Sequence, residues 1–412
     1  MTPQAYSYPT VGNDNLIYVP PYGLTLELDT MLVINPKSFE INQIKLDNNG
    51  TTEKYTFGIT VGSKIYWLPY GENRVLVYDT DNKEHKYIQV PLPLDRMKTR
   101  GKYVMGHIYN NKIYALPYGE TDSLDQVLIV DLEDDAVSVV NLNVPVNDKK
   151  KWHQSVIRDG IIYASPRGER RDNVFNYGIE FNCNDNSYIL RDFSKYYPNY
   201  ENSTMKYTTM AIANDVIYSI PYGYVDDFDF LLTNKNNEWS SQRLDITDTT
   251  RKYFTHVHTK NNKLYFPPAG HHVDWSKFLI IDGNTGQYTI KDLNVGLETK
   301  KYFTGIENSQ GKVFYIPRGG CVCDPLSEWK RCGDLADILV IDTKDDSHYT
   351  IDISEVFTDN TTIEKYNASC IVDDVIFAMP YGESDSFQTV LVFDTISEKI
   401  IKTLDLNELQ II

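Results

Sequence analysis

The sequence predicts an all-β fold: a single β-propeller of four-stranded antiparallel blades, with eight blades favoured and seven as the alternative. The main observation is a heptapeptide ending in Pro-x-Gly that occurs eight times, in copies that begin at residues 17, 65, 113, 162, 217, 264, 313 and 376. The second observation is that similar strand-like segments surround the copies. Four short antiparallel strands in about 50 residues are typical of a propeller blade.

The segments of one unit follow a fixed order. A first strand, such as residues 54–61, is joined to the heptapeptide by a short turn. The heptapeptide starts with β-branched and aromatic residues, as a buried strand does, and its proline and glycine end that strand. A third strand, such as residues 75–80, ends in an aspartate that suits a tight turn, and a fourth, such as residues 85–92, follows it.

The units start near residues 1, 54, 102, 151, 206, 252, 301 and 365, and together they account for residues 1–412 as one domain. No Pro- or Ser-rich linker separates them, which argues against a string of small sandwiches. Tight hairpin turns argue against a parallel solenoid. The first unit lacks the lysine that opens the other seven and has Tyr6 in its place. It is therefore either a modified closing blade or a cap on a smaller ring.

The order of motifs resembles the kelch repeat, most clearly in residues 54–80 and 102–132. In that repeat a basic residue opens the innermost strand, an apolar-Tyr strand ends in a glycine pair, and the next strand ends in Tyr-Asp. Here Pro-Tyr-Gly replaces the glycine pair and the later tryptophan is absent. The resemblance implies a propeller and, most often, a binding role.

Composition excludes several classes of function. The formal charge is 40 − 57 = −17, which disfavours nucleic acids and anionic membrane surfaces as partners. No apolar run reaches the length of a spanning helix, and the first residues do not read as a signal peptide. Five cysteines favour a reducing compartment, so we expect a cytoplasmic protein. No phosphate loop or common hydrolase motif is present, and no cofactor is expected.

Seven units carry a lysine followed by an aromatic residue at the same position. If this strand is innermost, as the kelch resemblance implies, the lysines form a ring at one mouth of the central channel. Such a ring would attract an acidic protein segment or a small anion. The alternative is a structural pairing with acids that follow the Pro-x-Gly turns, at Glu72, Glu120, Glu169, Asp226, Asp274 and Glu383. The lysines are Lys54, Lys102, Lys151, Lys206, Lys252, Lys301 and Lys365.

Three histidines are candidate catalytic residues if the protein is an enzyme. His256 and His258 are two residues apart on one strand and are expected to project into the channel, as is His153 from another strand. Such a set can bind metal or act as acid and base. The alternative is that each is a hydrogen-bonded structural histidine.

Two loops on the Pro-x-Gly side offer further candidates. The loop of the seventh unit contains Cys321, Cys323 and Cys332, which with His271 of the preceding unit could form a zinc site. Their spacing matches no known zinc motif, so free thiols or one disulfide are the alternatives. Trp329 in the same loop and Arg167 in the fourth unit are candidate ligand contacts, because an arginine fork suits a carboxylate.

We therefore expect a non-catalytic binding scaffold that recognises an acidic protein segment or a small anionic ligand at the lysine-rich mouth. One alternative is an enzyme that acts on a sugar or other small molecule in the channel. The other is a structural lattice component, which a large exposed apolar patch would support.

Overall fold

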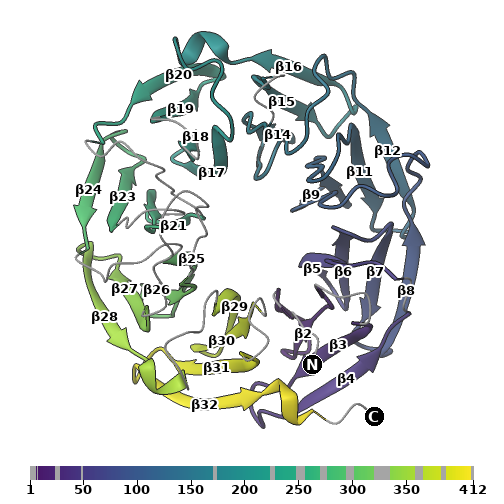
Figure 1. The fold of residues 1–412 in the computed structure, drawn as a ribbon, viewed down its shortest axis with the longest axis vertical. Coiled ribbons are helices and arrows are strands. Elements are labelled where there is room, and N and C mark those ends of the chain that lie inside the picture. Colours follow the sequence, from purple (N-terminus) through teal and green to yellow (C-terminus); the bar gives the residue numbers. More distant parts are fainter. Residues whose placement is uncertain are drawn as a thin grey trace, which may run out of the picture.

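The computed structural model is a ring of eight four-stranded antiparallel sheets around a central opening, with almost no helix (Figure 1). It describes residues 6, 8–23, 28–47, 50–169, 174–222, 228–246, 256–269, 276–293, 301–319, 335–357, 365–381 and 387–409. The predicted fold class and the favoured number of blades are confirmed. No helix in these ranges is long and apolar enough to cross a membrane.

The strands of the first four blades run from the channel outward in chain order. Blade 1 contains β1 (Thr10–Val11), β2 (Ile17–Val19), β3 (Thr30–Ile34) and β4 (Ile41–Lys45). Blade 2 contains β5 (Tyr55–Val61), β6 (Lys64–Pro69), β7 (Arg74–Asp79) and β8 (Glu84–Gln89). Blade 3 contains β9 (His107–Tyr109), β10 (Lys112–Ala115), β11 (Gln126–Asp131) and β12 (Val137–Asn141). Blade 4 contains β13 (Val156–Arg158), β14 (Ile161–Ala164), β15 (Tyr177–Asn182) and β16 (Tyr188–Asp192).

The last four blades repeat this order. Three short 3-10 helices each follow the outermost strand of a blade: η1 (Ser194–Tyr196) follows blade 4, η2 (Ser354–Val356) follows blade 7 and η3 (Leu406–Glu408) follows blade 8. Blade 5 contains β17 (Tyr207–Ala213), β18 (Val216–Pro221), β19 (Phe230–Lys235) and β20 (Glu238–Arg243). Blade 6 contains β21 (His258–Lys260), β22 (Lys263–Phe266), β23 (Lys277–Asp282) and β24 (Tyr288–Asp292). Blade 7 contains β25 (Tyr302–Glu307), β26 (Lys312–Pro317), β27 (Asp337–Asp342) and β28 (Ser347–Asp352). Blade 8 contains β29 (Tyr366–Val372), β30 (Val375–Pro380), β31 (Thr389–Asp394) and β32 (Lys399–Asp405).

The ring closes by side-chain packing between the first and last blades. Each blade is one contiguous stretch of chain, so none of the described strands is exchanged across the seam. Tyr6 is buried there in one apolar cluster with Ile17 and Leu32 of blade 1 and Phe377 and Met379 of blade 8. The first unit is thus a complete blade, and the tyrosine in place of its lysine belongs to the seam.

Neighbouring blades are also joined by buried carboxylates on the hairpin turns between their third and fourth strands. Asp135 of blade 3 accepts bonds from Lys64 (2.6 Å), Tyr66 (2.5 Å) and Lys86 (2.6 Å) of blade 2. Although burial alone raises the pKa of Asp135, the bonds from Lys64, Lys86 and Tyr66 lower it to about 2. This carboxylate therefore stays ionised at any physiological pH.

Replacement of this carboxylate by an amide is expected to weaken the contact between blades 2 and 3. We expect Asp135→Asn to lower the free energy of unfolding by about 1–3 kcal/mol, because two lysine ammonium groups lose their anionic partner. Urea unfolding at pH 7 measures the change, and Asp81→Asn, in an exposed turn of blade 2, is the matched control. Equal midpoints for the two variants would contradict a bridging role for Asp135.

Candidate functional site

The predicted lysines lie between blades and not on an open surface. Six of the seven are described, and each is at most 2% exposed: Lys54, Lys102, Lys151, Lys206, Lys301 and Lys365. Lys252 lies outside the described residues. In five of the six, the ammonium group donates to a carbonyl oxygen in the loop of the preceding blade, such as Leu28 O at 2.8 Å from Lys54 Nζ and Leu335 O at 3.0 Å from Lys365 Nζ.

Burial changes the chemistry of these lysines. It lowers the pKa of Lys102 to about 8, and it lowers the pKa of Lys151 against the opposing effect of Asp125 at 2.7 Å. The expectation of an open lysine ring is not met at these six positions, because the neighbouring blade encloses the ammonium groups. The interblade alternative fits better, although its main partners are carbonyl oxygens and not the predicted loop acids.

A second ring lies beside the lysines and is formed by the middle residue of each Pro-x-Gly turn. In six blades the backbone N–H of this residue donates to the carbonyl oxygen of the lysine, as Tyr70 N does to Lys54 O at 2.9 Å and Arg167 N to Lys151 O at 2.8 Å. We call these eight residues the tyrosine–arginine ring: Tyr22, Tyr70, Tyr118, Arg167, Tyr222, Ala269, Arg318 and Tyr381.

Contacts run along this ring from blade to blade. The aromatic ring of Tyr22 lies 6.2 Å from that of Tyr70 and 6.4 Å from that of Tyr381, and the Arg318 guanidinium lies 4.8 Å from the Tyr381 ring. Apart from Arg167, sequence reasoning treated these positions only as turn residues. An alignment of the eight heptapeptides at position x, where seven copies carry Tyr or Arg, was the signal that could have identified them.

Arg167 is the one candidate ligand contact that the structure places in this ring. It is 7% exposed, and its guanidinium lies 5.4 Å from the Tyr118 ring and 5.3 Å from the Tyr222 ring. Nη1 donates to the Tyr118 hydroxyl at 2.5 Å, whereas Nε has no hydrogen-bond partner. Within the described ranges no carboxylate pairs with this guanidinium. A buried cation without an ionic partner is costly and is therefore a candidate anion site.

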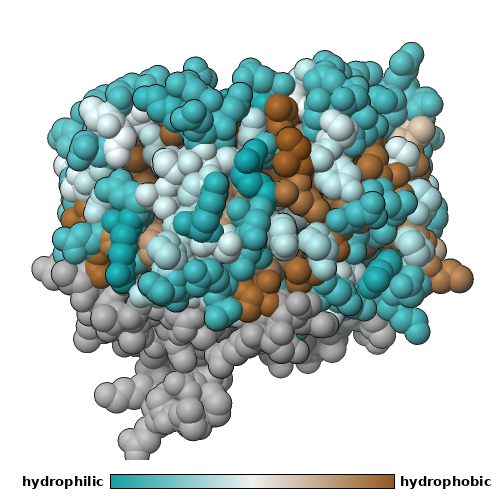
Figure 2. Space-filling view, turned by 90° about the horizontal axis from the view of Figure 1, so that it is seen from above, coloured by the Kyte–Doolittle hydropathy of each residue, from teal (hydrophilic) through white to brown (hydrophobic). Residues whose placement is uncertain are grey.

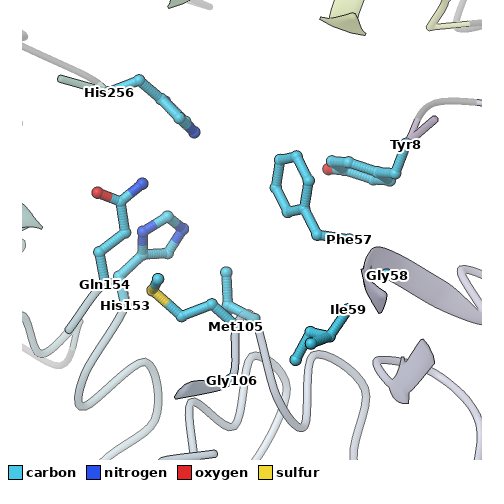
Figure 3. Close-up of a pocket in the computed structure, with 10 residues that line it drawn as sticks. Tyr8, Phe57, Gly58, Ile59, Met105, Gly106, His153, Gln154 and His256 are labelled. Carbon is cyan, nitrogen blue, oxygen red and sulfur yellow. The ribbon is translucent and has the colours of Figure 1, made fainter. Parts of the chain in front are cut away.

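A cavity of about 360 Å³ opens next to this ring (Figure 3). It is formed by the N-terminal segment and by the irregular chain that follows the lysines of blades 2, 3, 4 and 6. In blade 2 the pairing register shifts between Tyr55 and Gly58, which breaks the strict alternation that the sequence analysis assumed. The lining residues are Tyr8, Phe57, Gly58, Ile59, Val104, Met105, Gly106, His153, Gln154 and His256.

Two of the three predicted histidines meet in this cavity. His153 and His256 both line it, and Figure 3 shows their rings on the same side, across from Tyr8 and Phe57. Burial, followed by the nearby charge of Arg318, lowers the pKa of His256 to about 3. Burial, followed by the charge of Arg167, also lowers the pKa of His153 well below its usual value. Both imidazoles are therefore neutral at pH 7.

The third predicted histidine does not join this pair. His256 has a φ of 51°, so the chain is left-handed there and the two-residue alternation with His258 fails. His258 lies at the start of β21, where its Nε2 is 3.0 Å from Glu307 Oε2 of blade 7. Of the two, only His256 is among the described residues that line the cavity, and the hydrogen bond between His258 and Glu307 is what the structural alternative expects.

Cys321, Cys323, Cys332, His271 and Trp329 lie outside the described residues. In the part of the chain that the structure describes, no group of three or more His, Cys, Asp or Glu side chains could hold a metal ion.

Comparison with known proteins supports the fold and nothing finer. No family model and no curated protein matches this chain. Among solved structures, AztD from Citrobacter koseri is similar with a TM-score of 0.53 and 10% identity over 92% of both chains. A catalytically inactive virginiamycin B lyase from Staphylococcus aureus, solved with quinupristin, has a TM-score of 0.48 and 9% identity over 93% of this chain and 94% of that one. At such low identity the likeness to AztD concerns the propeller fold alone.

Proposed function

We propose that the protein is a binding propeller that recognises an anionic ligand, a small acid or the acidic segment of a protein, in the central channel at Arg167. The observation that carries this proposal is the buried guanidinium of Arg167, which has aromatic neighbours and no paired carboxylate in the described ranges. The kelch-like order of motifs also supports a binding role. The proposed contact is thus Arg167 and not the enclosed lysines.

The geometry around Arg167 suits a carboxylate. Tyr118 and Tyr222 hold the planar guanidinium from two neighbouring blades, which limits the freedom that a ligand would otherwise have to remove. A guanidinium presents its N–H groups in a fixed fork that matches two carboxylate oxygens. Low exposure strengthens the attraction, because little water competes for either partner.

Removal of the Arg167 charge is expected to weaken anion binding. We expect Arg167→Gln to weaken binding of a hexaglutamate peptide and of inorganic phosphate at least tenfold, since a hydrogen bond to a charged group contributes about 1.5–3 kcal/mol. Isothermal titration calorimetry at low salt measures this. Arg243→Gln, at an exposed arginine paired with Asp229, is the matched control and should bind as the wild type does. If both variants bind equally, Arg167 is not the anion site.

An enzyme remains the second candidate because two neutral imidazoles, those of His153 and His256, face one cavity. A neutral imidazole can accept a proton. Cleavage of a glycosidic bond, however, commonly uses a pair of carboxyl groups, and none is among the described residues that line the cavity. Binding therefore accounts for the cavity more simply.

The lattice alternative finds little support on the described surface. The large exposed apolar side chains lie in four separate parts of the ring: Leu94 after blade 2, Ile108 in β9, Ile189 in β16, and Ile396 and Ile401 in blade 8. Figure 2 shows one side of the ring, where apolar residues form separate groups among hydrophilic ones. A contiguous apolar patch is the usual sign of a permanent contact surface.

A further inference from the structure

We propose that the ligand is a monocarboxylic acid with an apolar body of one or two rings, its carboxylate bound at Arg167 and its body in the neighbouring cavity. This inference rests on the proposed anion site and adds the chemical class of the ligand. It follows from the walls of the cavity, from the connection between the cavity and Arg167, and from the volume.

The cavity walls are apolar or neutral. Phe57, Ile59, Val104 and Met105 line one part of it, and Figure 3 shows the Phe57 ring directed into the open space. None of the described lining residues carries a charge at neutral pH, because the histidines are neutral. A second anionic group placed here would lose its water, which costs several kcal/mol or more, and Arg318, the cation whose charge acts on His256, is not among the described residues that line the cavity. The body of the ligand is therefore uncharged.

Tyr118 connects the Arg167 guanidinium with His153, which lines the cavity. Arg167 donates to the Tyr118 hydroxyl, and the Tyr118 ring lies edge-on to the His153 imidazole at 5.2 Å between ring centroids. His153 lines the cavity, and its pKa is lowered first by burial and then by the charge of Arg167. An acid that binds Arg167 and extends past Tyr118 and His153 would reach the cavity.

The volume limits the size of that body. A dry apolar cavity of about 150 Å³ holds one benzene ring. The cavity here has about 360 Å³, at the small end of the range for small-molecule sites. It therefore accommodates one or two rings and excludes a folded peptide. His153, Gln154 and His256 supply neutral polar groups to which a single N–H or O–H of the body can bond.

Binding of four small probes to the full-length protein tests the inference, with calorimetry or ligand-detected NMR as the measurement. Indole-3-acetate has both the carboxylate and an apolar ring body. Acetate has only the carboxylate, and indole-3-ethanol has only the ring body. Glutarate has a second carboxylate. We expect indole-3-acetate to bind at least tenfold more tightly than each of the other three. Its binding should fall at least tenfold in Arg167→Gln.

A variant with a filled cavity tests binding of the apolar body of the ligand separately from binding of its carboxylate. Met105→Trp should weaken the binding of indole-3-acetate at least tenfold and leave the affinity for acetate within a factor of two, because only the apolar body of the ligand occupies the cavity. Leu94→Trp, at an 82% exposed position, is the control for an added indole and should change neither. Ile59→Trp, at a second lining residue, serves if Met105→Trp does not fold.

The outcomes distinguish this inference from the function on which it rests. If hexaglutamate and phosphate bind through Arg167 while indole-3-acetate binds no more tightly than acetate, the apolar-body inference is wrong and the anion site stands. If glutarate binds as tightly as indole-3-acetate, the restriction to one charge is wrong. If indole-3-ethanol binds as tightly as indole-3-acetate and Arg167→Gln changes neither affinity, both the inference and the anion site are wrong.

Discussion

Acidification from pH 7 to pH 4 is expected to lower the free energy of unfolding by about 3 kcal/mol, because the buried histidines must gain protons as they unfold. Burial lowers the pKa of His107 to about 4 and that of His256 to about 3, whereas an unfolded histidine titrates near pH 6.5. Between pH 6.5 and pH 4 each shift alone would correspond to about 3 kcal/mol. Partial exposure of both side chains to the channel reduces this, so we expect roughly half of the sum.

The sign follows from the direction of the shifts. A histidine whose pKa is lower in the folded state contributes stability above pH 6.5, and this contribution is lost as the pH falls toward the folded value. Asp135, with a pKa of about 2, loses its contribution only below pH 3.8. The change between pH 6.5 and pH 4 therefore reports mainly on the histidines.

Urea midpoints at pH 4, 5, 6 and 7, followed by tryptophan fluorescence, measure this dependence. His107 Nε2 is 2.7 Å from Ser155 Oγ of the next blade, and His107→Gln can keep that hydrogen bond without titrating. This variant should therefore lose less stability on acidification than the wild type. His348→Gln, on the outermost strand of blade 7, is the control. Parallel pH profiles for wild type and His107→Gln would contradict the explanation.

The repeat architecture was predictable because the same sequence pattern recurs in every blade. Alternation between strand-forming runs and Pro-x-Gly or Asn-rich turns depends on neighbours in sequence, so it predicts eight sheets without knowledge of tertiary contacts. Even the position of the lysines was correct, since Lys54 and Lys365 directly precede the innermost strands β5 and β29. What they contact was not predictable, because carbonyl oxygens of a neighbouring blade have no signature in the sequence.

The site was predicted less well than the fold, for two physical reasons. The inner strands are irregular after the lysine, as the register shift in β5 and the positive φ of His256 show, so strict alternation misplaced the inward side chains. The residues at position x, such as Tyr118 and Arg167, were visible in the repeat alignment. Their importance depends on which loops surround the channel, which only the closed ring defines.

Loss of an interblade lysine is expected to have a large effect on stability, greatest at Lys151. Its ammonium group is fully buried and donates to Asp125 Oδ1 at 2.7 Å, to Leu124 O at 3.3 Å and to Ser123 Oγ. Removal of one partner of a buried ion pair leaves the other uncompensated and typically costs 3–5 kcal/mol. Asp125 keeps 28% exposure and can regain some water, so we expect Lys151→Met to cost about 3 kcal/mol.

Urea unfolding of matched variants at pH 7 separates this role from an ordinary surface pair. Lys45→Met removes a lysine that is 68% exposed and pairs with Asp29 at 2.7 Å, and it should cost less than about 1 kcal/mol. A double-mutant cycle of Lys151→Met with Asp125→Asn should show a coupling of about 1 kcal/mol or more, because the two side chains are in contact. Since the ammonium group is enclosed, Lys151→Met should also bind hexaglutamate as the wild type does. A stable variant that loses this binding would indicate that the lysines bind the ligand and would contradict the interblade role.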